Sequence, residues 1–149
     1  MPQSFTSLKC HIIFKTRGRK RAPDSQALRR LRRSLQKILE GQRCHAVEMG
    51  GEDDHLHLLV GLHPSVSVAN VVRSLKSSSS GWIGRNFGQL KFPGWQKGYA
   101  AFSVSPSQIE GVRSYIQNQR EHHRKMSFEE EVRRLMKKIG VEIRDDFFE

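Results

Sequence analysis

The order of apolar and polar residues along the chain predicts four strands. β-branched and aromatic residues gather in short runs, and turn-forming residues such as Pro23, Pro106 and the run 50–53 separate them. The expected strands cover residues 8–16, 45–49, 55–62 and 98–105. So few residues separate the second from the third that we expect these two to pair antiparallel.

Apolar residues at helical spacing predict four helices. In the first of them, Leu28, Leu31 and Leu35 recur every three or four residues and form one stripe. The expected helices cover residues 24–40, 65–83, 107–125 and 127–139. The last begins with a capping box at residues 127–130, and Gly140 ends it.

The element order strand, helix, strand, strand, helix, strand is that of the ferredoxin-like split βαβ arrangement. We therefore expect an α+β fold, in which helices cover one face of an antiparallel sheet and two further helices are added at the C-terminal end. A chain of 149 residues fits one domain over residues 1–149. The same fold serves nucleic-acid binders, nucleases and small-molecule enzymes, so particular residues must indicate the function.

The chain is strongly basic. Its net charge is +11 and its pI is about 10.3, which indicates a polyanionic partner, with nucleic acid the leading candidate. A solvated helix face accounts for part of the cluster at residues 29–33. The residues that we expect to contact DNA are Lys15, Arg17, Arg19, Lys20, Arg21 and Arg120.

Two classes of protein are disfavoured by composition. No stretch approaches the roughly 18 apolar residues of a membrane span, and the N-terminus lacks the apolar core of a signal peptide, so we expect a cytoplasmic protein without a membrane partner. Cys10 and Cys44 have no neighbouring cysteine, which argues against a zinc ribbon or a disulfide framework. Both are expected to be reduced core residues.

His55 and His57 lie two residues apart in the third expected strand. Side chains at this spacing share one face of a strand, so the two imidazoles can bind one metal ion while Leu56 and Leu58 face the other way. Asp54 could hold an imidazole N–H. Such a pair arises by chance in roughly a third of sequences with this histidine content, and solvent-facing histidines on an edge strand are the plain alternative.

The third expected helix carries Tyr115 and Gln119, which are four residues apart and therefore share a face. Gln119 can offer an amide oxygen to a metal, and the Tyr115 phenol can act as a nucleophile when it is deprotonated. Asn118 points elsewhere on the helix and receives a secondary role. The alternatives are a core or interface tyrosine and a solvated glutamine.

Three motifs in this order resemble the single-tyrosine HUH transposases, the transposase A proteins of IS200/IS605-type insertion sequences. They are the His55 and His57 pair, the run at 115–119 and the strand at 99–105. The resemblance covers nearly the whole chain, from the first strand to residues 145–148. It extends to the branch associated with repeated extragenic palindromes.

The resemblance implies a mechanism. His55, His57 and Gln119 would hold one Mg²⁺ or Mn²⁺ ion, and Tyr115 would attack single-stranded DNA to give a 5′-phosphotyrosine link and a free 3′-hydroxyl. One phosphodiester is exchanged for another, so no nucleotide cofactor is required. Members of the family recognise hairpins near the element ends, and they act as homodimers whose active sites can be shared between subunits.

Two other classes of function stay open at this stage. In a non-catalytic or domesticated nucleic-acid-binding protein the histidines would be incidental, and Phe14, Phe102 or Tyr99 would stack on bases. In a metal-dependent hydrolase, water would attack and Tyr115 would only position the substrate.

Overall fold

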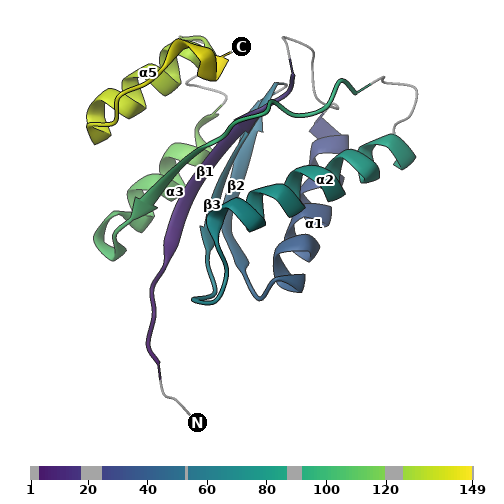
Figure 1. The fold of residues 1–149 in the computed structure, drawn as a ribbon, viewed down its shortest axis with the longest axis horizontal. Helices are drawn as coiled ribbons and strands as arrows, with labels where there is room; N and C mark the ends of the chain where they lie inside the picture. The colour runs from purple at the N-terminus through teal and green to yellow at the C-terminus, as the bar shows by residue number, and fades with distance from the viewer. Residues whose placement is uncertain (1–3, 18–24, 53, 87–91, 120–125, 149) are drawn as a thin grey trace.

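The computed structural model describes residues 4–17, 25–52, 54–86, 92–119 and 126–148. Strands and helices follow one another along the chain in the expected order (Figure 1). The elements are β1 (Lys9–Lys15), α1 (Ser25–Gly41), β2 (His45–Glu52), β3 (His55–Gly61), α2 (Val68–Asn86), β4 (Ala100–Val104), the 3₁₀ turn η2 (Pro106–Gln108), α3 (Ile109–Gln117), α5 (Phe128–Ile139) and the 3₁₀ turn η3 (Asp145–Phe148).

The four strands form one antiparallel sheet in the order β2-β3-β1-β4. The strand β3 therefore lies between the parallel strands β1 and β2, which is the split βαβ arrangement. The expected α+β fold is confirmed. β3 is a central strand, so the two histidines at its beginning do not lie on a sheet edge.

Helices cover both faces of the sheet. Figure 1 shows α1 and α2 on one side and α3 and α5 on the other. The alternation of side chains along β1 and β3 explains the two layers, because Phe14 and Leu58 face α1 and α2 while Ile13 and His57 face α3 and α5. The C-terminal helices thus enclose the face that carries the histidines.

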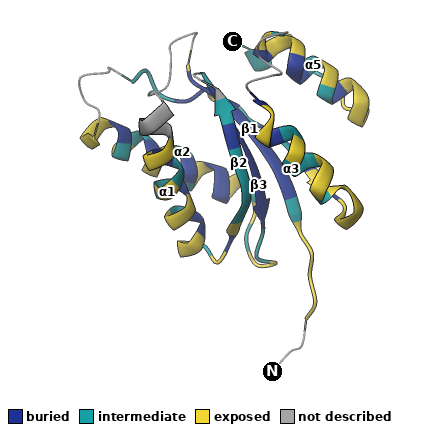
Figure 2. Ribbon diagram, turned by 180° about the vertical axis from the view of Figure 1, so that it is seen from behind, coloured by how far each residue is buried: buried dark blue, intermediate teal, exposed yellow. Residues whose placement is uncertain are grey.

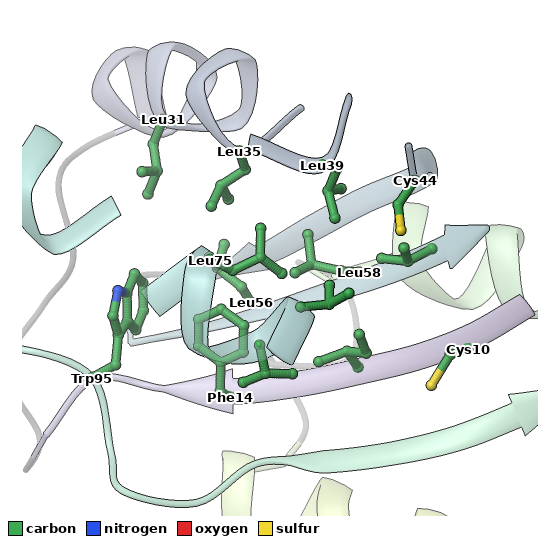
Figure 3. Close-up of a cluster of buried hydrophobic side chains, with 14 of the residues drawn as sticks. Cys10, Phe14, Leu31, Leu35, Leu39, Cys44, Leu56, Leu58, Leu75 and Trp95 are labelled. Carbon is green, nitrogen blue, oxygen red and sulfur yellow. The ribbon is translucent and has the colours of Figure 1, made fainter. Parts of the chain in front are cut away.

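The main core lies between the sheet and the pair α1 and α2. The apolar stripe of α1 reaches it through Leu31, Leu35 and Leu39, which are fully buried against β1, β3 and α2 (Figure 3). Cys10 and Cys44 are free thiols in this core, as expected. Figure 2 shows the consequence in the ribbon, since β1 and β3 are almost entirely dark blue, the edge strand β2 is largely teal, and the outer sides of the helices are yellow.

Two expected boundaries are wrong. The run 50–53 was expected to form a turn, but β2 continues through Glu52 and pairs with the start of β3. The third helix was expected to run without a break to residue 125, but α3 ends at Gln117, with Asn118 as its C-cap at φ −96° and ψ 22°, and Gln119 is helical again. Residues 120–125 lie outside the described part of the chain.

Glycine explains why β2 continues beside α3. A Cβ atom on Gly50 would lie 2.5 Å from the backbone oxygen of Ile116 and 2.8 Å from its Cγ2, so only glycine lets the helix approach the strand this closely.

The last α-helix, α5, begins and ends where the sequence predicts. Ser127 and Glu130 form the capping box, and Gly140 ends the helix at φ 85°.

Among the helices that the structure describes, none is long and apolar enough to cross a membrane.

Candidate functional site

The site is built on the first residues of β3. His55 and His57 are both fully buried and point to the face covered by α3 and α5, whereas Leu56 and Leu58 belong to the core on the opposite face. Solvent-facing histidines are therefore excluded. A strand with one face fixed in the core holds the two imidazoles in one orientation.

Asp54 orients the first imidazole. Its Oδ1 atom lies 2.8 Å from Nδ1 of His55, and a carboxylate can only accept, so the Nδ1–H group donates to it. With its proton on Nδ1, His55 presents an accepting Nε2 next to the Gln119 amide oxygen, which also only accepts, so that the two atoms could bind one metal ion but not each other. The pairing of a carboxylate with a histidine is the usual support of a metal-binding imidazole, and it fits the role expected for Asp54.

Glu131 completes a cluster that the sequence did not indicate. Its Oε1 atom lies 2.9 Å from Nε2 of His57 and 3.8 Å from Nε2 of His55, and the side chain is 2% exposed. The capping box sets the register of α5, so that Phe128 and Glu131, three residues apart, both face the sheet. The Phe128 ring packs 4.7 Å from the His55 ring, which brings the helix start onto the histidine pair.

Gln119 also reaches the pair. Its Oε1 atom lies 3.1 Å from Nε2 of His55, and the side chain is buried. It does not belong to the helix of Tyr115, because α3 has already ended, yet its Nε2 still lies 3.5 Å from the Tyr115 carbonyl. Asn118, by contrast, is exposed at the helix end. Of the two neighbours, Gln119 is therefore the one brought to the imidazoles.

The Tyr115 ring lies 5.7 Å from the ring of His57 in the same chain. Burial raises the pKa of the phenol well above its ordinary value, and the negative charge of Glu131, whose carboxylate accepts a hydrogen bond from the phenol, raises this pKa further. A smaller effect from Gln119 acts in the opposite direction. In this arrangement the phenol is held protonated, next to a carboxylate that can accept its proton.

His11 on β1 is a second neighbour that the sequence analysis missed. Its Nε2 atom lies 2.9 Å from Nδ1 of His57 and the residue is 3% exposed. Burial, and then the neighbouring His57, lower the pKa of His11 to about 3. The Glu131 carboxylate only accepts, so His57 donates to it through Nε2–H and accepts from His11 at Nδ1, and a metal ion bound at Nε2 would replace that proton. Because side chains alternate along β1, His11 lies on the same face as Ile13, and this pattern in the sequence could have identified His11 as a neighbour of the site.

The donor set fits one divalent ion. Nε2 of His55, Nε2 of His57 and a carboxylate oxygen of Glu131 all lie within 4.8 Å of one another. Ligand atoms that surround one ion at about 2.0–2.2 Å are themselves about 3–4 Å apart, close to the separations found here. Two imidazoles with a carboxylate and an amide oxygen suit Mn²⁺ and also Mg²⁺.

The residues expected to contact DNA are only partly described. Lys15 is 9% exposed and pairs in register with His55, so it lies within the sheet beside the site. Arg17 is exposed. The other expected contacts lie outside the described residues, namely Arg19, Lys20, Arg21 and Arg120.

Burial excludes two of the aromatic platforms considered for a non-catalytic binder. Phe14 is fully buried in the main core, and Phe102 is 9% exposed and packs in the cluster beneath α5. Neither ring is open to a base. Tyr99 is half-buried.

Comparison with known proteins gives consistent results. A family model described as "Transposase IS200 like" matches residues 4–119. Transposases for insertion sequence element IS200 from Salmonella typhimurium and Salmonella typhi are each 30% identical over 118 residues, which cover 76% of this chain and 77% of theirs.

Two solved structures share the fold with a TM-score of 0.63. One is a proposed transposase from Deinococcus radiodurans R1, with 23% identity, and the match covers 80% of this chain and 98% of that one. The other is a REP-associated tyrosine transposase bound to a REP hairpin, with 13% identity, and the match covers 83% of this chain and 73% of that one.

Proposed function

Since this chain belongs to the IS200-like transposase family, we propose that it cleaves and rejoins single-stranded DNA through a covalent bond to Tyr115. The observation that carries this proposal is the position of the phenol, which lies beside His57 and donates to the Glu131 carboxylate. A nucleophile, a proton acceptor and a group of metal-binding side chains thus meet at one place.

In the proposed reaction the Tyr115 oxygen forms a bond to phosphorus while the bond from phosphorus to the 3′-oxygen breaks. The phenol proton passes to Glu131, and the departing 3′-oxygen takes a proton from solvent. The product is a 5′-phosphotyrosine and a free 3′-hydroxyl. The reverse reaction with another 3′-hydroxyl rejoins the strand, and the bond energy is kept throughout.

His55, His57 and Glu131, together with Gln119, would hold the Mg²⁺ or Mn²⁺ ion. When bound, this ion polarises the scissile phosphate and stabilises the charge that builds on its oxygens. The chain's own residues prepare the site for it. Asp54 keeps the proton of His55 on Nδ1, and the core residues of β3 fix the face of the sheet from which both imidazoles project.

For the substrate, we infer hairpins in single-stranded DNA at the ends of a mobile element. The net charge of +11 supports a nucleic-acid partner, and one solved structure with this fold holds a REP hairpin. A homodimer would hold two DNA ends. Tyr115 lies beside the histidine pair of its own chain, so one subunit carries the tyrosine and the metal-binding side chains of one site. The alternative is that the tyrosine of one subunit serves the histidines of the other, and mixing two inactive variants tests it.

A denaturing gel with an end-labelled oligonucleotide from the flanks of the gene tests the proposal. We expect a covalent adduct in Mg²⁺ or Mn²⁺, none in excess chelator, and none with Tyr115→Phe. Tyr99→Phe is the matched control, because the chain contains two tyrosines and this change removes only the hydroxyl of the one that is not beside the histidine pair, while its ring is kept.

The other outcomes identify the competing functions. Adduct formation by Tyr115→Phe would refute the assignment of Tyr115 as the nucleophile. Metal-dependent cleavage without an adduct would identify a hydrolase, and tight hairpin binding without cleavage would identify a binding protein.

A further inference from the structure

A groove lined by basic residues lies on the face of the sheet opposite to the histidine pair, between α2 and the segment that leads into β4. Its volume is about 500 Å³. Its basic and hydroxyl-bearing lining residues are Arg17, Arg73, Lys76, Lys97, Ser77 and Ser80. No acidic side chain lines it among the described residues. Four cations in one groove give it a positive potential, which attracts polyanions.

Three of the four cations are available to a ligand. The side chains of Arg17, Arg73 and Lys97 are exposed and form no hydrogen bond or ion pair with any described residue. Lys76 is instead held in place, because its ammonium group donates to the carbonyl oxygens of Gln96 and Gly98, each at 2.7 Å. The groove therefore combines a fixed charge with adjustable ones.

An aromatic ring accompanies the charge. Tyr99 lines the groove and is half-buried, so part of its ring is open to a base. Lys76 lies 5.9 Å from the centre of this ring and holds a positive charge beside it. A positive groove with an aromatic platform is the usual arrangement for single-stranded nucleic acid, because unpaired bases can stack while the backbone follows the cations.

Two backbone hydrogen bonds place the groove at the same end of the sheet as the candidate site. The backbone N–H of Thr16 donates to the Asp54 carbonyl at 2.8 Å, and that of Arg17 donates to the Gly94 carbonyl at 2.8 Å. Asp54 holds His55, and Gly94 lines the groove. The groove and the candidate site therefore lie at one end of the sheet, on its two opposite faces.

We propose that this groove binds the sugar–phosphate backbone of the unpaired DNA strand that continues from the cleavage site. The inference rests on the proposed function for its substrate. It adds Arg73, Lys76 and Lys97 to the expected DNA contacts and gives Arg17 a defined position among them.

The test measures binding of the full chain in the Tyr115→Phe background, so that no strand is cleaved. The groove variant is Arg73→Ala with Lys97→Ala. The matched control is Lys137→Ala with Lys138→Ala, which removes the same charge from the exposed side of α5. The probes are an oligothymidylate of about 15 nucleotides and a blunt hairpin without an unpaired tail.

We expect the groove variant to bind the oligothymidylate at least about tenfold more weakly, with a salt dependence reduced by about one to two phosphate contacts. Binding of the blunt hairpin should change by less than about twofold, and the control should retain both affinities. Thermal melting and circular dichroism establish that both variants are folded.

Unchanged binding of the oligothymidylate by a folded groove variant would overturn the proposal. An equal loss for both probes would also overturn it, and would assign the groove to a hairpin stem. Failure of the wild-type chain to form an adduct would refute the proposed function alone, because groove binding is measured without cleavage.

Discussion

Oε1 of Glu131 lies 2.9 Å from Nε2 of His57, although the two residues are 74 positions apart in the sequence. The contact joins the last described α-helix to a central strand. It brings a carboxylate to the Nε2 atoms of the two imidazoles, whose Nδ1 atoms are already held by Asp54 and His11. The site therefore depends on how α5 packs on the sheet.

Replacement of Glu131 by glutamine should weaken Mn²⁺ binding by at least about tenfold, because an anionic ligand becomes neutral while its shape is kept. Calorimetric titration with Mn²⁺ measures this directly, without DNA. Glu129→Gln is the control, since that residue begins the same helix but is exposed and paired with Arg133. Equal affinity in Glu131→Gln and wild type would remove Glu131 from the metal site.

His11→Ala should weaken Mn²⁺ binding by about 10- to 100-fold, because Nδ1 of His57 loses the partner that orients the ring. His11→Gln should restore part of the affinity, since the end of its amide can occupy a position close to that of Nε2. Both variants are titrated with Mn²⁺ and melted thermally. If both variants melt like the wild type but bind Mn²⁺ with different affinities, His11 acts by orienting the His57 ring. If they lose thermal stability while Mn²⁺ affinity is unchanged, His11 acts only through packing.

Gly50→Ala should destabilise the chain by about 1–3 kcal/mol and reduce adduct formation, because its Cβ would meet Ile116 and displace the helix that carries Tyr115. The control is Gly111→Ala on the same helix, where nothing lies within 4 Å of the new Cβ. That change should raise stability by about 0.5–1 kcal/mol. Chemical denaturation and the adduct gel measure the two effects, and a harmless Gly50→Ala would show that α3 does not need this close contact.

Mixing Tyr115→Phe protein with His57→Ala protein tests whether subunits share sites. We expect no recovery of cleavage, because Tyr115 contacts the His57 of its own chain and each subunit would keep its own defect. Mass measurement of tagged chains must first show that the subunits exchange. Recovery of activity in an exchanged mixture would mean that the tyrosine serves the histidines of the partner.

Local sequence determined the helices and strands and the pair of imidazoles on β3. The alternation through residues 55–60 fixed His55, His57 and Leu59 on one face and Leu56, Leu58 and Val60 on the other, because a strand turns successive side chains in opposite directions. The capping box at Ser127 and Glu130 fixed the start of α5 for an equally local reason. The order of strands and helices was sufficient to predict the sheet topology.

Tertiary structure decided which other side chains contact this pair of imidazoles. Glu131 and His11 reach His57 from 74 and 46 positions away, and no local periodicity encodes such a contact. Packing of α5 on the sheet selects Glu131 among the acidic residues of its first turn, and the pairing of β1 with β3 places His11 beside His57. Periodicity specifies the face that a residue occupies, whereas its partner across that face depends on how whole elements pack.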